Sequence, residues 1–207
     1  MWKKTIVAGA GALIALVVTA GCSSSDSGSE HPAEHSTSVS SATASPAAPS
    51  AEAHNDADVT FAQQMIPHHT QAVEMSDTLL AKQGIDPRVT ELATQIKAAQ
   101  GPEIQQMQGW LTQWGTPSMP PMSGHGDMPG MSGMMSEQDM TALKDAQGVE
   151  AGKLFLTQMI AHHEGALTMA QSEIKNGQYP PAVEMARAIV TTQQREIDTM
   201  NGILASL

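Results

Sequence analysis

Apolar positions, with one histidine among them, recur along this chain at the spacing of an α-helix. Between residues 61 and 75 they follow in steps of four, three, four and three, as Phe61, Met65, His68, Ala72 and Met75. Residues at such steps lie on one face of a helix. A second apolar stripe runs from residue 89 to residue 111, and no segment alternates apolar and polar residues with a period of two. We therefore expect helices and no β-strands.

Helix start and stop signals divide the chain further. Asp86-Pro87 combines an N-cap residue with proline at the first helical position. Residues 136–139, Ser-Glu-Gln-Asp, resemble a capping box that opens one long helix, and Asn176-Gly177 is typical of its end. Pro180-Pro181 predicts the start of a last helix, which runs to the C-terminus.

The chain also contains an internal repeat. Segment 61–75 matches segment 155–169 at a constant offset of 94 residues (155 − 61), with Phe, Met, His-His, Ala and Met all recurring. A second match follows at an offset of 93 (189 − 96), between 96–107 and 189–200. The repeated unit is therefore a hairpin of two helices. Two such hairpins predict an all-α fold, a four-helix bundle over residues 56–207 with a long connection between its second and third helices.

The first helix of each hairpin carries the pattern Met-x-x-His-His-x-x-x-x-x-Met. If these two helices face each other, four imidazoles and four thioethers converge inside the bundle. Thioether sulfur selects Cu(I), and imidazole binds either oxidation state of copper. Because a ligating imidazole must be neutral, copper affinity should fall as the pH drops through roughly 6.5. Met and Ala could instead form an ordinary core, but the duplication favours metal binding by Met65, His68, His69, Met75, Met159, His162, His163 and Met169.

The connection between the hairpins, residues 115–135, is a second candidate for metal binding. It has a Met or His donor at every third position from 119 to 134, and Pro, Gly and Ser lie between them. This composition argues against a helix or a strand, so we expect the segment to lie outside the packed bundle. A flexible chain of sulfurs could fold around Cu(I), whereas the alternative is low-complexity drift in a loop. These second-tier candidates, which we call the Met-rich connection, are Met119, Met122, His125, Met128, Met131 and Met134.

The composition of the chain supports this interpretation. Fifteen Met residues stand against two Phe, one Tyr and three Trp, which suggests either a pliable core or a need for thioether sulfur. The net charge of −11 argues against a nucleic-acid partner, because binding to phosphate requires positive charge. A single Cys excludes a disulfide framework and a zinc site built from Cys ligands.

The N-terminus predicts export to the cell envelope. Residues 1–21 have the Lys3-Lys4 start and the apolar run of a signal peptide, and the run is too short to be a comfortable membrane span. Cys22 follows Ala-Gly as in a bacterial lipobox, although Thr19 stands where Leu is usual, so we expect Cys22 to be lipidated and to anchor the protein to the outer face of the membrane. A plain secreted protein is the alternative. Residues 22–55, rich in Ser, Ala and Pro, should form a disordered tether.

Together, the doubled His-His segments, the export signal and the Met-rich connection resemble the domain of unknown function 305 family. The resemblance covers about residues 56–206 and implies a ferritin-like four-helix bundle. Some members are associated with copper binding and copper tolerance in the bacterial envelope, which implicates the eight Met and His residues of the repeats. The family often has Asp three residues before the Phe. The first repeat has this residue as Asp58, whereas the second repeat has Gly152 at the equivalent position. Only the first repeat could therefore use a carboxylate there.

Three hypotheses for the function follow. The favoured one is a lipid-anchored envelope protein that binds copper, Cu(I) above all, for sequestration or hand-over and that is not an enzyme. Its partners would be the metal ion and the membrane. A metal-free interaction module would instead use the Met stripe as a plastic recognition surface. A di-iron oxidase would need inward Glu residues and Glu-x-x-His pairs, and no Glu-x-x-His occurs in the sequence.

Overall fold

The computed structural model describes residues 53–116 and 132–207. Within these ranges the chain is all-helical and has no strand, as the sequence predicted. The predicted signal peptide, Cys22, nearly all of the predicted tether and the Met-rich connection as far as Met131 lie outside the described residues. The helices are α1 (Asp56–Leu80), α2 (Pro87–Gln113), α3 (Glu137–Asp145), α4 (Gly148–Asn176) and α5 (Pro180–Leu204).

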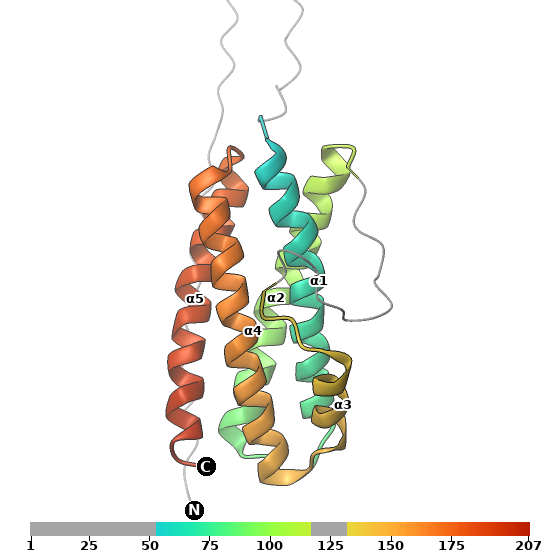
Figure 1. The fold of residues 1–207 in the computed structure, drawn as a ribbon, viewed down its shortest axis with the longest axis vertical. Helices are drawn as coiled ribbons and strands as arrows, with labels where there is room; N and C mark the ends of the chain where they lie inside the picture. Colours follow the sequence, from blue (N-terminus) through green and yellow to red (C-terminus); the bar gives the residue numbers. More distant parts are fainter. Residues whose placement is uncertain (1–52, 117–131) are drawn as a thin grey trace, which may run out of the picture. The chain divides into compact units, whose positions relative to one another are not determined.

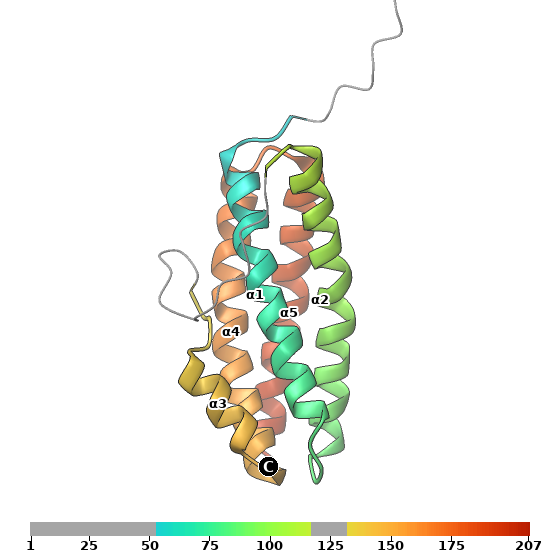
Figure 2. The ribbon, with the colours of Figure 1, turned by 90° about the vertical axis from the view of Figure 1, so that its right-hand side faces the viewer.

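The four long helices form two antiparallel hairpins that pack into a bundle (Figure 1). Helix α1 pairs with α2 and α4 pairs with α5, while α1 also packs against α4 and α2 contacts α5. The predicted four-helix bundle is therefore confirmed. The short helix α3 lies on the outside, where it contacts α1 and α4 (Figure 2). Helices α1 and α4 run antiparallel (Figure 1). Each carries its His-His pair near its middle, so the two pairs meet inside the bundle.

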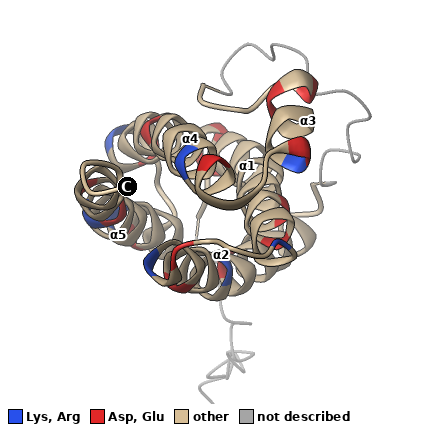
Figure 3. Cartoon of the chain, turned by 90° about the horizontal axis from the view of Figure 1, so that it is seen from below, with Lys and Arg blue, Asp and Glu red and all other residues tan. Residues whose placement is uncertain are grey.

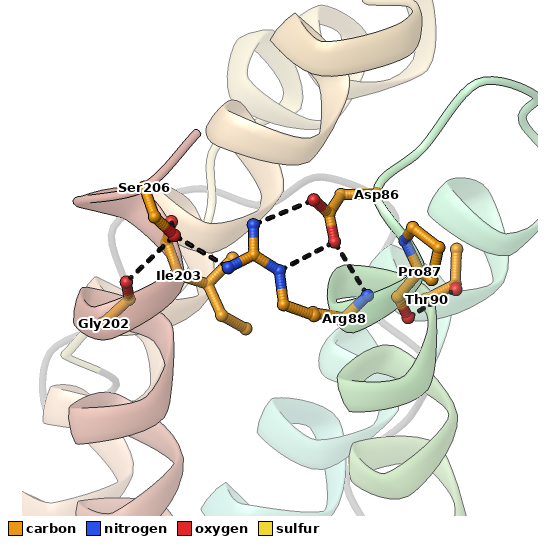
Figure 4. Close-up of polar contacts among 7 residues, drawn as sticks. All are labelled: Asp86, Pro87, Arg88, Thr90, Gly202, Ile203 and Ser206. Carbon is orange, nitrogen blue, oxygen red and sulfur yellow. Dashed lines mark hydrogen bonds and ion pairs between the residues drawn. The ribbon is translucent and has the colours of Figure 1, made fainter.

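The N-cap predicted at Asp86 is confirmed and also ties two helices together. The Asp86 carboxylate accepts a hydrogen bond from the Arg88 backbone N–H at 2.9 Å, and Pro87 is the first helical residue. The Arg88 guanidinium donates to Asp86 and, at 2.7 Å, to the hydroxyl of Ser206 (Figure 4). The start of α2 is thereby linked to the chain just after α5.

The prediction of one long third helix from the 136–139 capping box is wrong. The capping box is present, since Ser136 Oγ accepts from the Asp139 N–H at 3.1 Å, but the helix that it opens ends at Asp145. Ala146 is extended, and Gly148 has φ = +54°, a backbone region that favours glycine. Lys82 also donates to the carbonyls of Lys144 and Ala146, which satisfies the end of α3. The chain therefore turns between α3 and α4.

The bundle core consists of two hydrophobic clusters. Both clusters contain residues of both repeats, and equivalent residues lie in opposite clusters. Phe61 and its equivalent Phe155 are in different clusters, and so are Met75 and Met169. This exchange indicates that a pseudo-two-fold axis relates the two hairpins. The α3-end cluster includes Ala72, Met75, Ile96, Leu143, Phe155, Met159 and Met200. The Trp-end cluster includes Phe61, Met65, Met107, Trp110, Ala166, Met169 and Ile189.

Most charged residues lie around the outside of the long helices (Figure 3). In the described part of the chain, no helix combines the length and the apolar character needed to span a bilayer.

Candidate metal centre

Four buried histidines lie in the middle of the bundle. His68 and His69 come from α1, and His162 and His163 come from α4, each with no more than 1% of its surface exposed. The rings of His68 and His162 have centroids 3.7 Å apart and are tilted by 37°. These two residues are equivalent in the repeat, so their contact places them at the pseudo-two-fold axis. The sequence prediction that the His-His segments converge inside the bundle agrees with this geometry.

A glutamate holds the second histidine of each pair. His69 Nε2 lies 2.7 Å from Glu103 Oε2, and His163 Nε2 lies 2.7 Å from Glu196 Oε2. A carboxylate only accepts, so each Nε2–H is the donor, and in a neutral ring Nδ1 then carries a lone pair. Glu103 and Glu196 were not among the site residues predicted from the sequence. Their recurrence at the 93-residue offset was the signal, because it places both on the helix that packs against a histidine helix.

The first histidines of the two pairs differ from each other. His68 Nε2 lies 3.3 Å from the carbonyl oxygen of Ser132, which can only accept, so His68 also donates through Nε2. Neither ring nitrogen of His162 makes a well-formed hydrogen bond among the described residues, although the backbone of His68 lies close enough to affect its pKa. Within those residues, Nδ1 of His68, His69 and His163 also lacks a hydrogen-bond partner. Buried polar atoms are normally paired, so these five nitrogens of the histidine layer call for a ligand or an ion.

Burial keeps the central histidines neutral. Desolvation, followed by the electrostatic repulsion that a second proton on the adjacent His69 would exert, lowers the pKa of His68 to about 3. Desolvation and the nearby His68 and His163 likewise hold the pKa of His162 well below its ordinary value. Both rings therefore offer lone pairs at neutral pH. The expected titration near pH 6.5 is wrong for these two residues, because it assumed solvated imidazoles.

The four predicted methionines lie on both sides of the histidine layer. Met65 and Met169 belong to the Trp-end cluster, and Met75 and Met159 belong to the α3-end cluster. Met65 and Met159 stand one helical turn before the His-His pairs of their helices. The structure thus brings the imidazoles together and divides the thioethers between two layers. Their role as ligands stays a prediction, as it does for partly exposed Met134 and for Met119, Met122, His125, Met128 and Met131 outside the described residues.

Two glutamines extend the polar layer onto the other two helices. Gln100 on α2 and Gln193 on α5 are equivalent at the 93-residue offset, and both are buried. Each precedes its glutamate by three residues, about one helical turn. Within the described residues, no protein group pairs with either amide atom of Gln100 or with Oε1 of Gln193. Across residues 53–116 and 132–207, no group of three or more His, Cys, Asp or Glu side chains is arranged to hold a metal ion. A metal site here would need nitrogen and sulfur donors together.

Asp58, the acidic residue that only the first repeat keeps, has a structural role. Its buried carboxylate accepts from the backbone N–H groups of Asn55 at 2.6 Å, Gln178 at 3.0 Å and Tyr179 at 2.9 Å, which joins α1 to the start of α5. Burial alone would raise the pKa of Asp58, but hydrogen bonds with the Glu173 carboxyl and these N–H groups outweigh it and lower the pKa. Gly152, its counterpart, has the side chains of Val89 and Ile85 near the place of a Cβ.

Comparison with known proteins identifies the relatives of this chain. The sequence model of the family described as Domain of unknown function (DUF305) matches residues 58–204. No curated protein matches the chain. A solved DUF305 fragment from Deinococcus radiodurans is 34% identical with a TM-score of 0.66, covering 74% of this chain and 98% of that one. A DUF305 protein from Streptomyces coelicolor, a candidate secreted protein, is 33% identical with a TM-score of 0.66, covering 72% and 91%.

CopM is a third structural neighbour. Its Cu(II)-bound form is 31% identical to this chain with a TM-score of 0.63, covering 72% of this chain and 96% of CopM. CopM is also known in Cu(I)-bound and Ag-bound forms, both 29% identical to this chain. The family match spans both His-His segments and nearly all of the helical bundle. The resemblance seen in the sequence is thereby confirmed, and the chain belongs to the DUF305 family.

Proposed function

We propose that this protein binds copper in the cell envelope and holds it for sequestration or hand-over, without catalysing a reaction. One observation carries the proposal: three of the four central histidines are tied through Nε2, which leaves Nδ1 of each ring without a partner in the described structure. A histidine that ligates a metal through one nitrogen usually donates through the other to a carbonyl or carboxylate, which fixes the tautomer. The similarity to CopM, known in copper-bound forms, supports the choice of metal.

Cu(I) is the favoured oxidation state. Imidazole accepts both states of copper, but the buried thioethers of Met65, Met75, Met159 and Met169 are soft donors that prefer Cu(I). Solvent-free surroundings also favour an ion of lower charge, because desolvating a charge is costly. The Met-rich connection would supply additional Cu(I) sites, and lipidation of Cys22 would keep the protein at the outer face of the membrane.

The alternatives make different use of the same residues. A di-iron site needs several carboxylates around two metal ions, whereas Glu103 and Glu196 each pair with one histidine. A metal-free module would need the Met residues on its surface for recognition, but the four in the repeats are buried. The buried arrangement therefore favours metal binding over both.

Anaerobic titration with Cu(I) against a competing chelator tests the proposal. The purified protein should bind copper, and a variant with His68, His69, His162 and His163 all changed to Ala should lose the copper held by nitrogen donors. X-ray absorption separates nitrogen from sulfur ligation in the two proteins. His54→Ala is the matched control, since His54 stacks on Trp114 at the end of the bundle. An unchanged copper count and an unchanged nitrogen signal in the fourfold variant would refute the assignment.

A further inference from the structure

The last described part of the connection, Ser132–Met135, is fixed to the bundle. The side-chain amide of Gln71 on α1 accepts from the Met135 N–H at 2.7 Å and donates to the Met135 carbonyl at 2.9 Å. Gln71 and Met135 are both buried. Two hydrogen bonds from one amide to one residue specify both the position and the direction of this short segment. The expectation that residues 115–135 lie outside the packed bundle is therefore wrong for its final residues.

Glycines on both sides allow the backbone of this segment to approach α4 closely. A side chain at Gly165 would overlap the carbonyl of Ser132. A Cβ at Gly133 would lie 2.6 Å from the carbonyl oxygen of Ala161, and Gly133 also has φ = +83°. Both positions thus require glycine, for reasons of space and, at Gly133, of backbone conformation as well.

Gln71 and Gly165 are equivalent residues of the repeat (71 + 94 = 165). The neighbouring His-His pairs and the alanines that follow are identical in the two repeats, so the symmetry is broken at a position that serves this contact from both sides. In the first repeat, Gln71 binds the segment through its side-chain amide. In the second repeat, Gly165 has no side chain and so leaves room for the segment. The docked segment in turn brings the Ser132 carbonyl to His68 Nε2. Ser132–Met135 provides no such carbonyl to His162, whose backbone interaction is with His68.

We propose that Gln71 and Gly165 form a seat for Ser132–Met135, and that the seated segment positions His68 and limits access to the His68–His162 pair. Gln71 and Gly165 are positioning residues, because they act on His68 through Ser132. The docked carbonyl fixes His68 as the Nε2–H tautomer and so directs its lone pair to Nδ1. His68 and His162 are then unequal, because Ser132 sets the tautomer of His68 and makes no such contact with His162. The part of this inference that concerns metal rests on the proposed function.

Two variants and a matched control test the seat. Gln71→Leu keeps the size of the side chain and removes both hydrogen bonds, while Gly165→Ala blocks the Ser132 carbonyl. Gln158→Leu is the control, because Gln158 is a buried glutamine on α4 whose amide donates to the Asp139 carbonyl at 3.0 Å, at α3 instead of the seat. Far-UV circular dichroism selects variants with parental helix content, and Gln71→Leu serves if Gly165→Ala does not fold.

In the metal-free protein, Gln71→Leu should speed amide hydrogen exchange at Met135 by about tenfold or more, as two hydrogen bonds are lost. The ¹⁵N spectrum of His68 should change from one tautomer to a mixture. Silver(I) uptake should become faster at an unchanged stoichiometry. Gln158→Leu should match the parent in all three measurements.

Parental exchange at Met135 together with a parental His68 spectrum in both seat variants would overturn the seat. Unchanged silver uptake with a changed His68 spectrum would overturn only its control of access. A parent protein that takes up no silver would instead overturn the proposed function, and it would leave the metal-free result standing.

Discussion

Glu173 on α4 is predicted to make the protein less stable as the pH rises. Its side chain is 1% exposed and lies against Asp58, another buried carboxyl group. Burial, and then the hydrogen bond and the charge of Asp58, raise the pKa of Glu173 from its ordinary 4.5 to about 8. Two ionised carboxylates cannot hydrogen bond, whereas a protonated Glu173 can donate a hydrogen bond to the Asp58 carboxylate and stays protonated at neutral pH. Glu173→Gln keeps a donor there and removes the titration.

The sign and size of the effect follow from the two pKa values. Between pH 4.5 and 8 the folded protein holds a proton that the unfolded chain has released, so the free energy of unfolding falls as the pH rises. At about 1.4 kcal/mol per pKa unit, the loss is about 3 kcal/mol from pH 5 to pH 8. A domain of this size shifts its Tm by roughly 2–4 °C per kcal/mol. Relative to the parent, Glu173→Gln should therefore gain roughly 10 °C in Tm over this range.

Thermal unfolding of the metal-free protein at pH 5, 6, 7 and 8 measures this gain. Only the difference between parent and variant matters, because other groups titrate equally in both. Glu164→Gln is the control, since Glu164 is an exposed residue of the same helix. Parallel Tm curves for Glu173→Gln and the parent would show that Glu173 is already ionised at pH 7, and the account of the carboxyl pair would be wrong.

Three further predictions concern other parts of the chain. Burial holds the pKa of His68 at about 3, so the folded protein lacks a proton that the unfolded chain binds below pH 6.5, and stability falls as the pH falls from 6.5 towards 3. In urea unfolding, His68→Asn should lose less stability than the parent between pH 6 and 4, by about 1.4 kcal/mol per pH unit; equal losses would contradict it. Cys22→Ser should move the protein from the membrane fraction to the soluble fraction, and unchanged fractionation would exclude a lipid anchor at Cys22. Changing the five methionines of the Met-rich connection to Leu should lower the number of Cu(I) ions bound per protein. The metal-free stability should change by no more than about 0.5 kcal/mol. If the variant binds as many Cu(I) ions as the parent, the segment only connects the two hairpins.

The repeat explains why so much of the fold could be predicted. Two matched segments at helical spacing define the four long helices and the face that each buries, and burial of that face then brings the two His-His pairs together. The break between α3 and α4 was harder to foresee, because the segment up to Gly148 has no Pro and its capping box is genuine. It depends on a single glycine backbone angle and on Lys82 from a different hairpin.

The partners of the histidines depend on contacts between helices. Glu103 and Glu196 were visible as repeated residues, but pairing them with His69 and His163 needs the relative rotation of the packed helices. The pKa of His68 likewise follows from its complete burial, which an ordinary imidazole value does not include. The contact between Ser132 and His68 joins residues 64 positions apart through an irregular segment, which has no periodic pattern to signal it.

The complementary make-up of the two clusters has a consequence for the ancestry of this chain. A single hairpin contributes only about half of the residues of each cluster. On its own it would therefore leave an apolar face exposed to water. A second copy of the same hairpin, related by two-fold symmetry, would cover that face with identical contacts. The sequence is thus what fusion of a duplicated gene for a homodimeric hairpin would leave. In such a dimer the same histidine of two chains would meet at the axis, so the central layer could have existed before the linker that now joins its halves.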